Sequence, residues 1–137
     1  LAGLGNPCDT ADRLYNKSDA KLTDPQRFLW IAGYGYNWVC SGGLSVCYFA
    51  FDEAHFADRV RVYEAIGAKQ AAQVMREADQ AFGPNGPAAT LEGRQAQITD
   101  ALDAKLDKAS RRFWACGEEI YTQAYLYALE HPGDFQL

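Results

Sequence analysis

The stretch Trp38-Val39-Cys40-Ser41-Gly42-Gly43-Leu44-Ser45-Val46-Cys47-Tyr48-Phe49-Ala50-Phe51 decides the fold, because a pair of glycines interrupts a dense run of aromatic and aliphatic side chains. Glycine in apolar surroundings is costly in backbone entropy, so a pair of glycines indicates a tight turn with positive φ or a close backbone contact. We expect Ser41, Gly42 and Gly43 to form a structural turn between two buried helices, with Ser41 as the N-cap of the second helix. A turn that binds a ligand is the alternative.

A helix is expected on each side of this turn. Asp24 followed by Pro25 is a typical helix start, because the carboxylate accepts hydrogen bonds from free amides and proline has no amide to lose. The first helix is predicted from Pro25 to about Cys40. The segment from Leu44 to Phe51 is apolar on nearly every side, so it is predicted to be the buried partner in a helical hairpin.

Apolar residues recur at helical spacing in much of the remaining chain. Gly67 is expected to cap a helix at its C-terminus, and the Gly-Pro-Asn-Gly-Pro sequence at 83–87 cannot continue a helix, which predicts a loop from Gly83 to Ala89. Phe135 is expected to fold back on the body as a tail anchor. Further helices are predicted within 7–16, 54–66, 68–82, 90–113 with an interruption near Asp103, and 118–130.

The predicted fold class is all-α, because no stretch alternates apolar and polar residues with period two. A chain of 137 residues with 48% hydrophobic content is long enough for one domain with a core and too short to expect two. We predict a single compact bundle of about six to seven helices with a buried central helical hairpin. Residues 24–137 would form this helical domain, after an N-terminal segment of residues 1–23 that carries a short helix.

The charge of the chain bears on its partners. Eighteen acidic and thirteen basic residues give a formal net charge of -5. Phosphates repel such a surface, so we do not expect a direct nucleic-acid ligand. We expect a basic protein partner instead. There is no apolar run of the roughly eighteen residues that a membrane span needs, and no basic leader with a long apolar region. We therefore expect no membrane association and a cytoplasmic protein.

The four cysteines, Cys8, Cys40, Cys47 and Cys116, form no C-x-x-C pair. A zinc site is therefore not expected, even with two histidines in the chain. Because most of these cysteines lie in apolar sequence, we expect small reduced core residues. A disulfide between Cys40 and Cys47 around the glycine turn is the alternative.

Candidate catalytic residues are few. His55 opens a predicted helix and His131 precedes a helix-ending proline, so both are expected to be exposed or capping residues. The carboxylate pairs Asp52-Glu53 and Glu118-Glu119 stand at predicted helix starts, where capping explains them. We therefore predict that the chain is not an enzyme and uses no metal and no cofactor.

Several groups of residues match a known family: Gly42-Gly43, Tyr48-Phe49, Ile66-Gly67-Ala68 with Ala71, Ala72 and Ala78, Leu102 to Phe113, and His131-Pro132-Gly133-Asp134-Phe135. The family's signature is an Asn-Gly-Gly-Phe turn followed by a Gln, aromatic residues and an Asn, then an alanine-rich helix after an Ile-Gly-Ala step, and an ending like His-Pro-x-x-Phe. Over residues 24 to 135 the chain resembles the DNA-mimic protein (DMP) family. It departs from the signature at the turn, where Ser41, Leu44, Val46 and Ala50 replace the Asn, Phe, Gln and final Asn.

The resemblance implies an all-helical acidic protein, often dimeric, that occupies the DNA-binding surface of a bacterial regulator by presenting carboxylates where phosphates would lie. Such mimicry requires clustered carboxylates at phosphate-like spacing. Asp100, Asp103 and Asp107 have spacings of three and four, so they fall along one face of a helix, for which an ordinary solvated face is the alternative. The candidate partner-binding residues are Asp52, Glu53, Asp58, Asp100, Asp103 and Asp107.

The predicted function is that of a non-enzymatic acidic protein-binding module that inhibits or occludes a basic partner. This partner would be a DNA-binding regulator, or a nuclease toxin for which the chain serves as immunity protein. The alternative is a small helical ligand-binding or enzymatic domain that uses Tyr34, Tyr36, Trp38 and Cys40 around the glycine turn. A homodimer in which the aromatic helix packs against a second copy is a third hypothesis.

Overall fold

The computed structural model describes residues 22–51 and 53–135, and this part of the chain contains helices and no strands. The prediction of an all-α bundle is confirmed, with seven helices of seven residues or more and two helices of a single turn among the described residues. The short helix predicted within 7–16 lies outside the described residues. The helices are α2 (Asp24–Gly42), α3 (Leu44–Ala50), α4 (Glu53–Phe56), α5 (Arg59–Ile66), α6 (Lys69–Gln80), α7 (Leu91–Gln97), α8 (Asp100–Trp114), α9 (Gly117–Glu130) and α10 (Pro132–Phe135).

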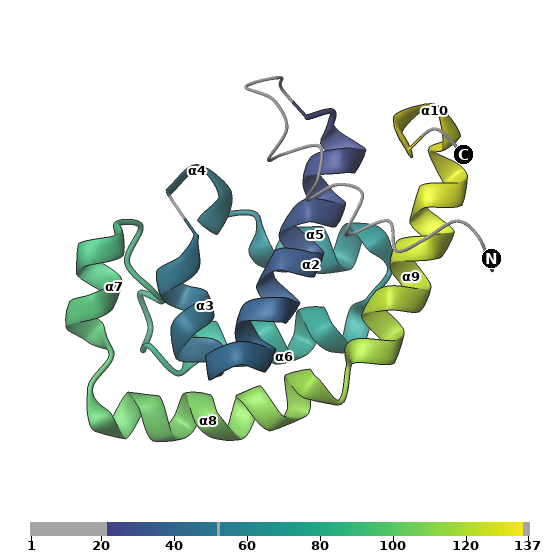
Figure 1. Cartoon of the computed structure of the whole chain (residues 1–137). Helices are drawn as coiled ribbons and strands as arrows, with labels where there is room; N and C mark the ends of the chain where they lie inside the picture. Colours follow the sequence, from purple (N-terminus) through teal and green to yellow (C-terminus); the bar gives the residue numbers. More distant parts are fainter. Residues whose placement is uncertain (1–21, 52, 136–137) are drawn as a thin grey trace.

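The long helix α2 runs through the middle of the bundle and packs against α3, α5, α8 and α9 (Figure 1). Its N-cap is Thr23 and not Asp24, which lies in the first turn. The Thr23 hydroxyl accepts a hydrogen bond from the Gln26 amide, and the Gln26 side chain accepts one from the Thr23 amide at 3.0 Å. This capping box satisfies two amides at once, which a lone aspartate cap would not do.

The corner between α2 and α3 is made by a single residue, Gly43, whose φ is 86°. The expectation that Ser41 caps the second helix is wrong, because Ser41 and Gly42 both belong to the last turn of α2. The first amide of α3, that of Leu44, donates instead to the buried hydroxyl of Ser110 in α8, at 2.8 Å. Helix α3 is therefore capped from a helix that lies far away in the sequence.

Replacing Ser110 with alanine is expected to lower the free energy of unfolding by about 1 kcal/mol, because the Leu44 amide would lose its acceptor inside the protein. Chemical denaturation of both proteins measures the difference. The control is Ser45→Ala, which removes a hydroxyl that donates to Asp103 at the exposed edge of the same helix and should change stability by less than about 0.5 kcal/mol. Equal effects of the two substitutions would contradict the capping role of Ser110.

Several predicted helix ends are confirmed and others are wrong. Gly67 ends α5 in the left-handed conformation, with φ 91°, and residues 81–90 form the non-helical loop that contains the Gly-Pro sequence. The single helix predicted over 54–66 is divided into α4 and α5 by a turn at 57–58. The interruption of 90–113 lies at Ile98 and Thr99 rather than near Asp103, because Thr99 caps α8 by accepting from the Leu102 amide.

The core is shared by all the longer helices, and α2 with α3 supplies its centre. Leu29, Val39, Leu44 and Tyr48 are fully buried. The apolar segment α3 is not buried on every side, however, because Phe49 is 37% exposed. The tail anchor predicted at Phe135 is confirmed, since α10 brings this ring into the core.

The cysteines of the described residues are all free. Cys47 and Cys116 are buried reduced thiols, as expected, but Cys40 is exposed, so the expectation of a core position is wrong for it, and no Cys40–Cys47 disulfide is formed. Burial raises the pKa of the Cys47 thiol to about 11, which keeps it protonated and unreactive at neutral pH. Cys8 lies outside the described residues.

None of the described helices is both long enough and apolar enough to cross a membrane.

Candidate functional site

Helix α8 presents the acidic residues that the sequence spacing predicted to lie on one face. The helix is held by a buried side that includes Leu102, Leu106 and Phe113. Rotation of 100° per residue places positions 100, 103 and 107 together along one flank of this buried side. We call Asp100, Asp103 and Asp107 the acidic row; all three are exposed.

The three carboxylates of the acidic row differ in their surroundings. Asp100 stands in the first turn of α8, where the helix dipole favours a negative charge. Asp103 accepts a hydrogen bond from the hydroxyl of Ser45 in α3. Asp107 forms an ion pair with Arg111 at 3.3 Å, and both side chains are more than half exposed. A pair so exposed is weak and readily exchanged for a partner's cation.

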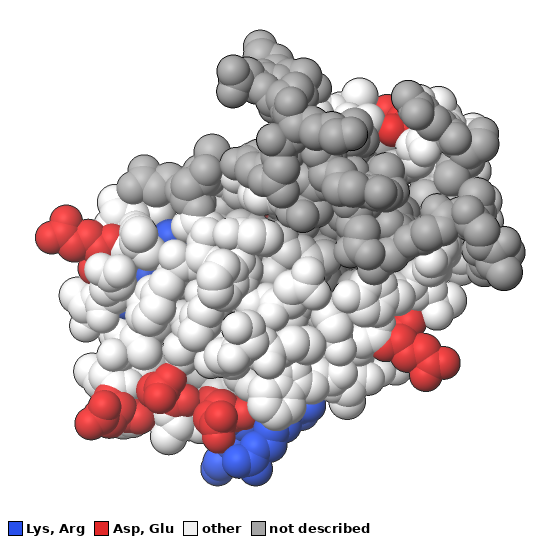
Figure 2. Space-filling view, viewed as in Figure 1, with Lys and Arg blue, Asp and Glu red and all other residues white. Residues whose placement is uncertain are grey.

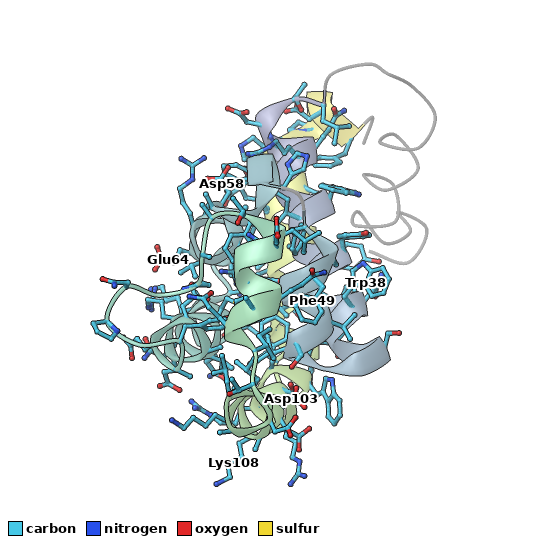
Figure 3. All side chains as sticks on the ribbon, turned by 90° about the vertical axis from the view of Figure 1, so that its left-hand side faces the viewer. Trp38, Phe49, Asp58, Glu64, Asp103 and Lys108 are labelled. Atoms are coloured by element: carbon cyan, nitrogen blue, oxygen red, sulfur yellow. The ribbon has the colours of Figure 1, made fainter. Side chains whose placement is uncertain are left out.

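The other flank of α8 is basic. Lys105, Lys108 and Arg112 are exposed there, and Arg112 forms an ion pair with Glu77 of α6. Figure 3 shows Asp103 and Lys108 on different sides of the helix. Figure 2 shows acidic side chains gathered over the N-terminal half of α8 with basic side chains beyond them. The acidic row and the basic flank therefore lie on different sides of α8, and Arg111, paired with Asp107, stands at the C-terminal end of the acidic row.

The remaining predicted partner-binding residues do not join the acidic row. Asp58 lies between Arg27, at 2.5 Å, and Arg61, at 3.6 Å, so its charge is balanced within the molecule. Figure 3 places Asp58 near the opposite end of the molecule from Asp103. Asp52 lies outside the described residues, and Glu53 begins α4 with a side chain that is not described.

Partly exposed aromatic side chains lie on the same side of the molecule as the acidic row, and the sequence analysis did not predict them as surface residues. Trp38 and Phe49 lie on the same side of the molecule as Asp103 (Figure 3). Trp114, at the C-terminal end of α8, is 43% exposed and donates from its indole nitrogen to the Val39 carbonyl at 2.8 Å. Phe49 belongs to the segment that the sequence predicted to be buried, and only the packing reveals that part of its ring faces solvent.

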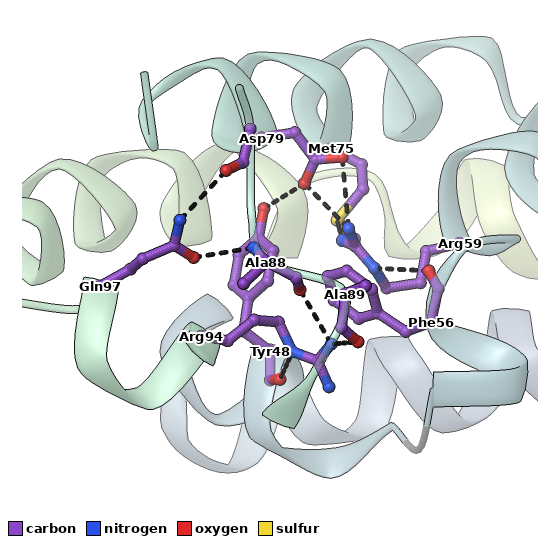
Figure 4. A network of polar contacts seen from close by, with 10 residues as sticks. Tyr48, Phe56, Arg59, Met75, Asp79, Ala88, Ala89, Arg94 and Gln97 are labelled. Atoms are coloured by element: carbon purple, nitrogen blue, oxygen red, sulfur yellow. Dashed lines mark hydrogen bonds and ion pairs between the residues drawn. The ribbon is translucent and has the colours of Figure 1, made fainter. Parts of the chain in front are cut away.

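Two buried arginines join the loop and helices behind α3, as Figure 4 shows. Arg94, fully buried, donates to the carbonyls of Tyr48 and Phe51 at 2.9 Å each, and to those of Ala88 and Ala89 at 3.2 and 2.7 Å. Its guanidinium also lies over a phenylalanine ring, 3.7 Å from the centroid. Arg94 thus ties α3 to the loop before α7.

The second buried arginine, Arg59, binds the carboxylate of Asp79 at 2.9 and 3.2 Å and the carbonyl of Phe56 at 3.1 Å. The hydroxyl of Tyr48 donates to the same carboxylate at 2.5 Å. Burial by itself lowers the pKa of Arg59, but Tyr48 and Asp79 outweigh it and the pKa is raised. The position of Arg59 among apolar residues at helical spacing, 56, 59 and 63, was a signal of its burial.

The aromatic residues around the glycine turn do not share one pocket. Tyr34 packs against Trp38, with ring centroids 5.8 Å apart, whereas Tyr36 packs against Phe113 and Tyr121 at 6.1 and 5.5 Å. An open groove of about 500 Å³ lies elsewhere, between the start of α6 and the junction of α8 and α9. The described residues contain no group of three or more His, Cys, Asp or Glu side chains that could hold a metal ion.

Fold and surface together define an all-α protein with an acidic row on one exposed helix flank and partly exposed aromatic side chains beside it. A family model described as DMP19-like protein matches residues 20–131. The chain belongs to this family. Comparison with the curated proteins and with the solved structures gives no match.

Proposed function

We propose that the chain is a non-enzymatic protein-binding module that covers the DNA-binding surface of a basic partner, a DNA-binding regulator or a nuclease toxin. The acidic row is the observation that carries the proposal. Seven residues of α-helix rise about 10.5 Å, so the row presents three carboxylates over that length. One DNA strand carries a phosphate about every 3.4 Å along its axis, which gives a similar number of charges over the same length.

The surroundings of the row support a protein partner. A basic DNA-binding surface has to be attracted by charge, and three exposed carboxylates on one flank do this, with the exposed Arg111 only at the C-terminal end of the row. The neighbouring Trp38, Phe49 and Trp114 add the kind of aromatic contact that holds protein interfaces together. Charge would set the rate of association, and the aromatic contacts would set the lifetime of the complex.

Neutralising the row tests the proposal. The chain is immobilised, a lysate of its source cell is passed over it, and basic proteins that it retains are purified for measured binding. In the variant Asp100→Asn, Asp103→Asn, Asp107→Asn the affinity for the retained protein is expected to fall by at least about tenfold, and the loss should shrink as salt rises. The matched control carries Asp24→Asn, Glu64→Gln and Glu92→Gln, three exposed carboxylates outside the row.

Competition with DNA provides the decisive outcome. A short duplex that binds the partner should be displaced by the chain and not by the row variant, because the two ligands would use one surface. A ternary complex of partner, duplex and chain would overturn the proposal, as would equal binding by the row variant and its control.

We also propose that the side of the molecule with Phe49 and Trp38 pairs with a second copy of the chain. Phe49 is 37% exposed on the same side of the molecule as Trp38, and a two-fold pairing through this side would cover its ring. Light scattering over a range of concentrations measures the mass directly. A monomer at every concentration would contradict this arrangement and would leave the binding of a basic partner unaffected.

A further inference from the structure

Helix α9 exposes two leucines on the side that faces away from the core, with the polar Thr122 beside them. Its inner side buries Ile120, Ala124 and Ala128 against the bundle. Half a turn away, positions 122, 125, 126 and 129 have the spacing of a single helix face. We call Tyr125, Leu126 and Leu129 the outer stripe; the two leucines are 45% and 46% exposed.

This arrangement is unusual for a helix at the edge of a bundle. Figure 1 shows α9 at one side of the molecule, and among the described helices its main contacts are with α2, α5 and α6, and with α10 at its C-terminal end. A surface helix normally turns polar residues outward, and Leu126 and Leu129 are apolar residues one turn apart at such outward positions. Exposed contiguous apolar side chains mark a surface for another macromolecule.

The charged residues near the outer stripe indicate which kind of partner binds it. From Phe113 to Leu137 the sequence contains no lysine and no arginine. Glu118 and Glu130, at the two ends of α9, are both exposed. The carboxylate of Glu119 accepts hydrogen bonds from the Gln70 and Ala71 amides of α6 at 3.2 and 3.0 Å. The outer stripe therefore lies between two free carboxylates with no cation near it in sequence.

A second copy of the chain is a poor occupant of this surface. In a two-fold pair the same patch meets itself, so an antiparallel pair of α9 helices would set Glu118 of one copy against Glu130 of the other at both ends. Like charges in such an interface oppose association. A partner helix with basic residues at both ends would place a cation against each glutamate in place of a like charge, and it would cover the leucines at the same time.

We propose that the outer stripe of α9 docks an amphipathic helix of a partner protein, with an apolar side that meets Leu126 and Leu129 and with lysine or arginine at each end to meet Glu118 and Glu130. This surface is separate from the acidic row, which lies on the N-terminal half of α8 at the other side of the molecule (Figure 1). Binding of a helix to an apolar stripe is a recurring mode of protein recognition.

A synthetic peptide tests the proposal with the full chain. The probe is a labelled helix as long as α9, with leucine on one side and lysine near both ends; its control has the same composition with the leucines spread over all sides. Fluorescence anisotropy measures affinity, and amide chemical shifts locate the binding surface. The patterned peptide should bind at α9, and Leu126→Ser with Leu129→Ser should weaken binding by at least about tenfold, because two partly exposed leucines would lose their apolar contact.

Three results would overturn the proposal. The first is binding that survives the double leucine variant and is lost with Asp103→Asn and Asp107→Asn, which would place the peptide on the acidic row. The second is equal affinity for the patterned and control peptides, which would mean attraction by charge alone. The third is a dimer in light scattering that the leucine variant dissolves, which would make a second copy the occupant. Thermal unfolding of the variant confirms that these exposed substitutions leave the fold intact.

Discussion

Replacing Arg94 with leucine is expected to lower the free energy of unfolding by about 3–5 kcal/mol. The guanidinium is fully buried and donates to four main-chain carbonyls, two in the α3 region and two in the loop before α7. Leucine fills part of the space but donates no hydrogen bond. The carbonyls would then be left buried without their donors.

Denaturant unfolding followed by circular dichroism measures this loss. The control is Arg111→Leu, which removes an arginine whose side chain is 72% exposed and should change stability by less than about 1 kcal/mol. Arg94→Lys is expected to recover little, because an ammonium group has three donors on one atom and cannot reach four carbonyls spread around a planar guanidinium. A loss below about 1 kcal/mol for Arg94→Leu would show that the four hydrogen bonds do not stabilise the fold.

The second large effect is expected at Asp79. Asp79→Asn keeps the shape of the side chain but removes the charge that faces Arg59, whose side chain is only 3% exposed. A buried cation that loses its counter-charge costs about 3–5 kcal/mol. Because Asp79 itself is 26% exposed, water reaches the site and a loss at the lower end, about 3 kcal/mol, is expected.

A double variant distinguishes charge from packing at this site. Arg59→Met combined with Asp79→Asn removes the stranded cation, so it should be more stable than Asp79→Asn alone. Glu64→Gln serves as the control, since it breaks an ion pair with Arg76 in which both side chains are well exposed, and a change below about 1 kcal/mol is expected. If Asp79→Asn is no more harmful than Glu64→Gln, the buried pair does not depend on its charge.

The acidic row was predictable because it depends only on spacing along one helix. Residues three and four apart share a face wherever the helix lies, so Asp100, Asp103 and Asp107 could be grouped before the fold was known. The sequence did not allow Asp58 to be excluded from the candidate partner-binding residues. Its partner Arg27 is 31 residues away, and nothing local in the sequence indicates that the two side chains meet.

Helix ends were predictable where the capping residue is local in the sequence, and not where it belongs to another helix. The end of α5 at Gly67 was predictable, because a left-handed residue with no Cβ ends a helix within its own turn. The start of α3 was not, since the expected cap at Ser41 lies inside α2 and the hydroxyl that receives the Leu44 amide belongs to Ser110. A helix end that is satisfied from another helix leaves no local sequence signal.

The amino-acid sequence by itself determined the all-α class, most of the helices, the loop at the Gly-Pro repeat and the grouping of the acidic row. These features follow from periodicity and from backbone preferences that act over a few residues. Only the tertiary structure decided that Arg94 is buried, that the charge of Asp58 is balanced by Arg27, and that Leu126 and Leu129 face solvent. Burial and charge balance depend on which side of a helix meets its neighbours, and a helix that is apolar on nearly every side, such as α3, leaves that choice to packing.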